Sequence, residues 1–132
     1  PDLIERLRGV IIENAPALKV IQEHDADDTL HYVDPPYVHS TRGFDAGGTH
    51  RAYRHEMTDD EHRELAAVLH SVQGMVVLSG YACDLYYREL YASWEHIECG
   101  THADGARDRV EVLWLNHACQ AGLRHRQQRL IA

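Results

Sequence analysis

Long apolar runs are missing from this chain of 132 residues. A membrane-spanning helix needs about 18 or more consecutive apolar residues, so the sequence excludes such a span. It also contains no internal repeat and no low-complexity tract. Because 44% of its residues are hydrophobic, the chain is too apolar to be disordered, and its length favours one globular domain over residues 1–132.

Cysteine is also scarce. The three cysteines, Cys83, Cys99 and Cys119, are too few and odd in number for a disulfide framework, which favours a protein of the reducing cytoplasm.

Positive charge is in deficit, with 13 Lys and Arg against 21 Asp and Glu and a formal net charge of -8. Such a balance argues against a dedicated nucleic-acid binder. The acids dominate up to Val33, whereas basic residues dominate from Thr101 onward, so a locally basic surface could still meet phosphates. These late basic residues are Arg107, Arg109, Arg124, Arg126 and Arg129, of which the last three fit a solvated terminal helix equally well.

The most informative segment that is present is Asp34-Pro35-Pro36-Tyr37, which follows the short apolar run 30–33. That run predicts a buried strand, and two prolines cannot continue it because each lacks an N–H and fixes φ. The chain is therefore predicted to leave the sheet at Asp34 in a stiff turn. This places a carboxylate and an aromatic ring at the carboxyl end of a strand, where open α/β sheets bind ligands.

The chemistry of this corner suits an amine on a flat ring. The Asp34 carboxylate and the Pro35 carbonyl can each accept a hydrogen bond, and the Tyr37 ring offers a face for stacking. Together they fit an exocyclic amino group on a planar heterocycle. The alternative is an ordinary Pro-Pro turn with an incidental Asp, since short motifs arise by chance.

Periodicity predicts an alternation of strands and helices. Thr58 and Glu61 are spaced as a capping box at the start of the clearest helix, and Gly80 is predicted to form a turn. The last two strands are predicted to pair antiparallel because the loop between them is too short for a crossover. Strands are expected at 9–13, 30–34, 75–79, 94–99 and 109–115, and helices at 15–24, 58–72, 84–91 and 118–131. This order predicts an α/β three-layer sandwich.

The Asp-Pro-Pro-Tyr segment resembles the catalytic motif of the Dam-like class of N6-adenine DNA methyltransferases. Further segments resemble the strands and helices that surround this motif in the family, and they occur in the same order. These segments are 8–14 with 17–21, 75–81, 85–94 and 109–116. The resemblance implies a Rossmann-like fold of the S-adenosylmethionine-dependent methyltransferase type.

The resemblance also implies an activity and its catalytic residues. The family transfers a methyl group from S-adenosylmethionine to the N6 amine of an adenine flipped out of DNA, as in phage or restriction-modification methylation. Asp34 and the Pro35 carbonyl would hold the amine, Pro36 completes the motif, and Tyr37 would stack on the base. Catalysis would consist of positioning and electrostatic stabilisation, with no covalent enzyme intermediate.

Other site residues follow from the same resemblance. Asp34 would lie near the methionine part of the cofactor, and Glu13 and Asn14 near its adenosine. The neighbouring strand end would form a wall of the substrate pocket through Ser79, Gly80 and Tyr81. The candidates for DNA contact are Arg42, Arg51, Tyr53, Arg54, Arg107 and Arg109. No metal site is expected.

The sequence departs from the family in two places. Pro16 stands where family members often carry Asp, and no Gly-x-Gly follows any predicted strand, so the family's glycine-rich cofactor loop is missing. The resemblance therefore predicts the C-terminal catalytic portion of a longer enzyme. The resemblance leaves open a homodimer or a partner that supplies the missing N-terminal half, and the chain alone is expected to bind S-adenosylmethionine weakly and to methylate nothing measurably.

Other functions remain open on the sequence alone. Related acid-Pro-Pro-aromatic corners modify cytosine amines or protein glutamine, and a non-catalytic remnant could serve as an interaction domain. A zinc module would use Cys99, His102, His117 and Cys119, although their spacing does not match well-attested zinc ligand pairs.

Overall fold

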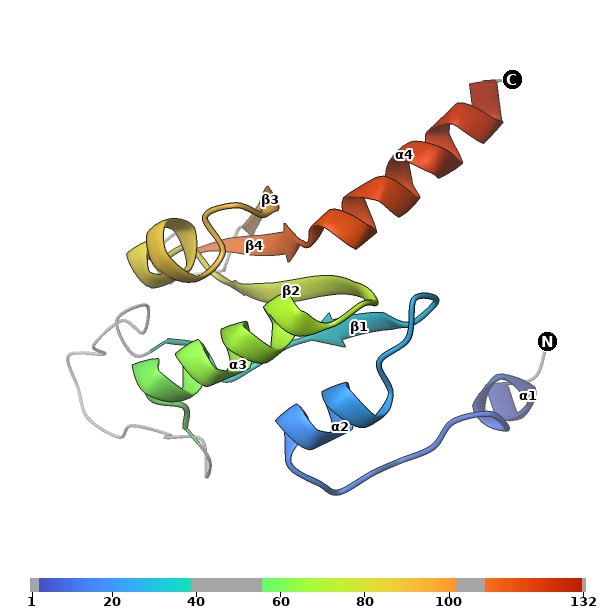
Figure 1. The fold of residues 1–132 in the computed structure, drawn as a ribbon, viewed down its shortest axis with the longest axis horizontal. Coiled ribbons are helices and arrows are strands. Elements are labelled where there is room, and N and C mark those ends of the chain that lie inside the picture. Colours follow the sequence, from blue (N-terminus) through green and yellow to red (C-terminus); the bar gives the residue numbers. More distant parts are fainter. Residues whose placement is uncertain (1–2, 39–55, 102–108, 132) are drawn as a thin grey trace.

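The structure is a computed structural model that describes residues 3–38, 56–101 and 109–131. It confirms the mixed α/β class, and none of the described helices is long and apolar enough to cross a bilayer. In chain order the elements are α1 (Leu3–Leu7), α2 (Ala17–Glu23), β1 (Leu30–Val33), α3 (Asp59–Ser71), β2 (Met75–Tyr81), the π-helix η2 (Leu85–Leu90), β3 (Glu95–Thr101), β4 (Arg109–Leu115) and α4 (His117–Ile131) (Figure 1).

The four strands form one mixed sheet in the order β1-β2-β4-β3. β1 runs parallel to β2, with Leu30 opposite Met75 and Val33 opposite Leu78. β4 is antiparallel to both of its neighbours, which confirms the predicted hairpin. Because β1 and β2 are parallel and in this register, their carboxyl ends meet at one edge of the sheet, next to the Asp-Pro-Pro-Tyr segment.

The core lies on the sheet face that α3 and η2 cover. Side chains alternate along a strand, so Val76 and Leu78 of β2 share this face with Trp114 of β4, and all three are fully buried. Leu69 of α3 and Tyr86 of η2 belong to the same cluster. α3 lies along the sheet, whereas α4 projects away from it towards the C-terminus (Figure 1).

The opposite face of the sheet is covered less completely. α4 approaches it at Met75, whose sulfur would lie 3.3 Å from a Cβ added at Gly122. The large apolar side chains Leu30, Tyr32 and Ile97 belong to this face and remain exposed.

α3 begins as the sequence predicts. The Thr58 N–H donates to Glu61 Oε2 at 2.7 Å, and the Glu61 N–H donates to Thr58 Oγ1 at 3.3 Å, which completes the capping box. Leu65 and Leu69 form the buried stripe, while Val68 and Val72 are half-buried.

Three sequence predictions are wrong. The run 30–33 forms β1 but is not buried: Leu30 is 57% and Tyr32 is 64% exposed, because β1 lies at the edge of the described sheet.

Residues 9–13 form no strand, and Ile12 is 93% exposed, because no described strand lies beside this segment to complete its hydrogen bonds. Gly80 is not a turn residue: β2 continues through it to Tyr81, paired with β4. A Cβ at Gly80 would lie 3.0 Å from Tyr86 Cε2, so the glycine allows η2 to pack closely against the strand.

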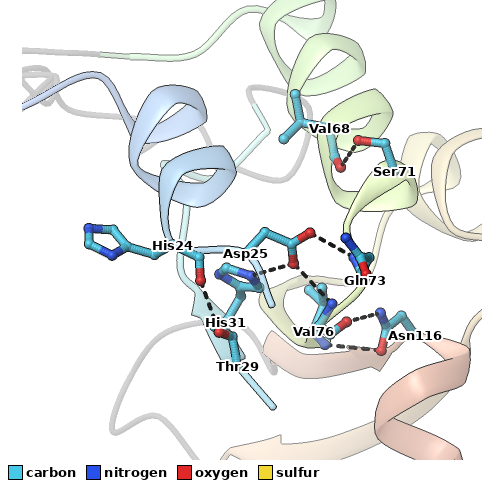
Figure 2. Close-up of polar contacts among 10 residues, drawn as sticks. His24, Asp25, Thr29, His31, Val68, Ser71, Gln73, Val76 and Asn116 are labelled. Atoms are coloured by element: carbon cyan, nitrogen blue, oxygen red, sulfur yellow. Dashed lines mark hydrogen bonds and ion pairs between the residues drawn. The ribbon is translucent and has the colours of Figure 1, made fainter. Parts of the chain in front are cut away.

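A polar network fixes the amino ends of the parallel strands (Figure 2). The Asp25 carboxylate accepts hydrogen bonds from the N–H groups of Gln73 and Gly74, at 2.8 and 2.9 Å, and from His31 Nε2 at 3.3 Å. Asn116 Oδ1 accepts from the N–H of Val76 at 3.0 Å. These contacts set the start of β1, β2 and α4 relative to one another, at the end of the strands opposite the Asp-Pro-Pro-Tyr segment.

Candidate active site

The Asp-Pro-Pro-Tyr segment leaves the sheet as predicted, directly after β1. Asp34 is exposed, and within the described residues no hydrogen bond or ion pair engages its carboxylate. Pro35, Pro36 and Tyr37 are half-buried, and Val38 is 3% exposed. The corner is therefore anchored at Val38 while its carboxylate remains accessible.

A cavity of about 560 Å³ lies beside this corner and is lined by Asp34, Pro35 and Pro36. Its apolar walls include Leu18 from α2 and Leu65 from α3. Sites for small molecules typically enclose about 300–1,000 Å³ and combine apolar walls with a few polar groups. The cavity thus has the size and the composition of a small-molecule site.

Glu13 reaches the same cavity from the segment before α2. His24 Nε2 lies 2.6 Å from Glu13 Oε1 and holds this carboxylate against the end of the helix. The structure therefore brings together Glu13 and Asp34, two of the three predicted cofactor residues. The third, Asn14, is exposed and does not line this cavity.

The cavity is acidic. Besides Glu13 and Asp34, the first turns of α3 contribute Glu61 and Glu64. Hydrogen bonds from the backbone and the side chain of Thr58 lower the pKa of Glu61, which keeps this carboxylate ionised. Four carboxylates around apolar walls favour a ligand that carries positive charge.

Tyr37 packs against Tyr81, the last residue of β2. Their ring centroids are 4.1 Å apart and the rings are inclined by 30°. Desolvation and the neighbouring Tyr81 and Asp34 raise the pKa of Tyr37 to about 12, and a hydrogen bond with Tyr81 adds to the shift. Tyr37 is thus a neutral ring with one face already covered.

The three residues predicted to form a wall of the substrate pocket, Ser79, Gly80 and Tyr81, lie on two faces of β2. Gly80 faces Tyr86 in the core, and by the alternation of the strand Ser79 and Tyr81 point to the opposite face. None of the three lines the 560 Å³ cavity.

Most predicted DNA-contact residues fall outside the described part of the chain, namely Arg42, Arg51, Tyr53, Arg54 and Arg107. Arg109 begins β4, where it pairs with Thr101. His102 of the zinc alternative is likewise outside the described ranges, and within those ranges no group of three or more His, Cys, Asp or Glu could hold a metal ion. The three cysteines are free thiols.

Sequence reasoning missed three residues of the site. Glu61 and Glu64 lie one turn apart on α3, and their spacing gives no sign that β1 ends beside them. His24 could not be linked to Glu13 because the contact depends on how the segment before α2 folds back along the helix.

Comparison with known protein families agrees with the resemblance seen in the sequence. A family model described as D12 class N6 adenine-specific DNA methyltransferase matches residues 2–103, a span that includes α1 to β3 and the whole motif. No curated protein matches the chain.

Proposed function

This chain belongs to the D12 class of N6 adenine-specific DNA methyltransferases, and on that basis we propose that its Asp34–Tyr37 corner presents the N6 amine of a flipped adenine to S-adenosylmethionine. The observation that carries the proposal is the accessible Asp34 carboxylate in the wall of a cavity of about 560 Å³ at the carboxyl end of β1. A carboxylate engaged in an ion pair would offer fewer free lone pairs to a substrate amine.

The corner would act through hydrogen bonding and stacking. Asp34 accepts one hydrogen bond from the amine and the Pro35 carbonyl accepts the other, while Tyr37 supports the base from one face. The amine of adenine is a weak nucleophile because its lone pair is delocalised into the ring. Two acceptors favour a more tetrahedral nitrogen and stabilise the positive charge that it gains during transfer. S-adenosylmethionine supplies the methyl group when it is bound.

The cavity fits this cofactor in volume and in charge. The methionine part would lie towards Asp34 and the adenosine towards Glu13, whose orientation is fixed by His24. The sulfonium and ammonium groups of the cofactor are cationic, so the acidic walls favour their binding. The sequence has no glycine-rich loop to complete the site, and we therefore expect weak binding by these 132 residues.

The proposed fold is the Rossmann-like sandwich of S-adenosylmethionine-dependent methyltransferases. Its support is the parallel β1–β2 pair with helices on both faces and a cavity at the carboxyl edge of the strands, which is where such sheets bind ligands.

Cofactor binding by the 132-residue chain tests the proposal first. Calorimetric titration with S-adenosylmethionine should give measurable binding that Asp34→Ala weakens about tenfold or more, because the variant removes a charge beside a cationic ligand. The matched control is Asp28→Ala, an exposed Asp at the other end of the same strand. Equal affinity in the wild type and both variants would contradict the role of Asp34.

Methyl transfer tests the substrate. Tritium from labelled S-adenosylmethionine is measured in duplexes that contain adenine and in duplexes built only from guanine and cytosine. We expect no measurable turnover by this chain alone, and robust turnover would refute that expectation. If label is incorporated against that expectation, its distribution identifies the substrate: label only in adenine-containing DNA supports adenine, whereas label in the adenine-free duplex favours a cytosine amine.

A further inference from the structure

We propose that Tyr81 is a positioning residue that backs one face of Tyr37, so that the target base stacks on the opposite face in the order Tyr81–Tyr37–base. The inference rests on the proposed function, because it concerns the same corner. Its physical basis is the close pairing of the two rings, 4.1 Å apart at an inclination of 30°.

Tyr37 needs such support because of where it lies. It follows β1 by four residues and is held on the far side by Val38, which is 3% exposed. A ring on a turn can change rotamer, and each alternative rotamer would move the stacking face away from the amine that Asp34 holds. A second ring at van der Waals distance removes that freedom. Aromatic pairs of this kind add stability beyond their buried area.

Tyr81 is well placed to give this support, since it belongs to a central strand. It pairs with Glu111 of β4, and the preceding Gly80 is fixed against Tyr86. The parallel register of β1 and β2 brings the end of β2 next to the corner. Tyr37 is thus backed by a residue of the sheet.

The surrounding charges agree with a neutral stacking platform. Desolvation by burial and the neighbouring Tyr81 raise the pKa of the Tyr37 phenol most, and Asp34, the hydrogen bond with Tyr81 and Glu111 add to the shift. A phenolate at this position would repel the Asp34 carboxylate that has to face the amine. The ring is neutral at neutral pH in any case, so the contribution of the pair is to orient it.

The test uses the 132-residue chain and a single-stranded oligothymidine that carries one 2-aminopurine, whose fluorescence is quenched on stacking. Tyr81→Leu should weaken binding of this probe about tenfold, while Tyr81→Phe, which keeps the ring, should restore most of the affinity. The matched control is Tyr87→Leu, which removes a tyrosine packed against Trp114 of the core. Its probe affinity should equal that of the wild type, and thermal melting reports any loss of folding in each variant.

NMR of ring-labelled tyrosine measures where the base stacks. The chemical shifts of Tyr37 and Tyr81 on addition of the probe would not differ in this way if Tyr81 only stabilised the fold. Without a ligand, Tyr81→Leu should remove the upfield ring-current shift from the Tyr37 resonances. On addition of the probe to the wild type, Tyr37 should shift upfield and Tyr81 should change little. Equal upfield shifts of both rings would show that the base inserts between them and would overturn the proposal.

The remaining outcomes separate this inference from the proposed function. If Tyr37→Leu weakens probe binding but Tyr81→Leu does not, the stacking role of Tyr37 in the proposed function stands and the role of Tyr81 is refuted. If Tyr37→Leu has no effect, or if the wild type does not quench the probe, neither the role of Tyr81 nor the stacking of the base on Tyr37 is supported. Titration with S-adenosylmethionine reports the cofactor part independently.

Discussion

The carboxylate of Asp25 accepts a hydrogen bond from the N–H of Gly74 at 2.9 Å, which joins segments 49 residues apart. A Cβ at Gly74 would lie 2.8 Å from the carbonyl oxygens of Ala26 and Thr29, so the two segments are in close contact. This contact fixes where β1 starts relative to β2. The register carries through to the carboxyl ends of both strands, where Tyr37 packs against Tyr81.

Replacing Asp25 should destabilise the fold in a pH-dependent manner. Hydrogen bonds from the N–H groups of Gln73 and Gly74 lower the pKa of Asp25 in the folded protein. A carboxyl group with a lowered folded pKa adds stability above its unfolded pKa of about 3.9, and this contribution is lost as the pH falls through the folded value. Asp25→Asn should therefore be less stable than the wild type at pH 7, and the difference should shrink below about pH 4.

Urea unfolding between pH 7 and pH 3 measures this difference. Asp28→Asn serves as the control, since Asp28 is exposed in the same turn, and it should behave as the wild type throughout. A gap between Asp25→Asn and the wild type that stays constant over this range would show that the ionised carboxylate is not the cause.

The Asn116 side chain should contribute strongly to the stability of the fold, because it makes three buried hydrogen bonds to the backbone. Its Oδ1 accepts from the N–H groups of Val76 and Cys119, at 3.0 and 2.9 Å, and its Nδ2 donates to the Gly74 carbonyl at 2.9 Å. Asn116→Ala leaves these backbone groups without that partner in a buried site, which should lower the free energy of unfolding by about 3 kcal/mol. The control is the exposed Gln128→Ala on α4, for which chemical denaturation should show no change.

Local sequence signals were sufficient for much of this fold. Thr58 and Glu61 predicted the start of α3 because a capping box depends on contacts within one turn. The Asp-Pro-Pro segment predicted the end of β1 because proline acts on its own backbone. The strand predicted at 9–13 was wrong because a strand, unlike a capping box or a proline turn, depends on a partner from elsewhere in the chain. It exists only where a neighbouring strand completes its hydrogen bonds, and apolar alternation cannot show whether that neighbour is present.

The motif predicted the corner that follows β1, whereas the roles assigned to its residues and to Glu13 stay predictions. Asp34 and Glu13 do line one cavity, yet the carboxylates of Glu61 and Glu64 belong to a helix whose packing angle no local pattern encodes. Likewise the place of β4 between β2 and β3 depends on which strand of the hairpin buries more surface against β2. Such features follow from tertiary packing, which depends on the whole chain and cannot be predicted from any local pattern in the sequence.

Gly80 and Gly100 offer a matched pair of strand glycines. A Cβ at Gly80 would lie 3.0 Å from Tyr86 and 3.4 Å from Trp114, whereas a Cβ at Gly100 meets nothing within 4 Å. Gly80→Ala should cost about 1–3 kcal/mol because the two buried rings have little room to move. Gly100→Ala should be neutral or slightly stabilising, because glycine is unfavourable in a strand. Thermal melting measures the stability of both variants, and equal melting temperatures would contradict the close packing of η2 on β2.

His24 should affect cofactor binding although it does not line the 560 Å³ cavity. Its Nε2 lies 2.6 Å from Glu13 Oε1, and both side chains are partly exposed, so the contact is worth at most about 1 kcal/mol. His24→Ala should therefore weaken S-adenosylmethionine binding about two- to fivefold, through a less well oriented Glu13, while the melting temperature falls by at most about 5 °C. Calorimetric titration measures the effect, with the exposed His125→Ala as the control. In a Glu13→Ala background the His24 substitution should have no further effect, because its only route to the cofactor is then removed. A full additional loss in the double variant would show that His24 acts independently of Glu13.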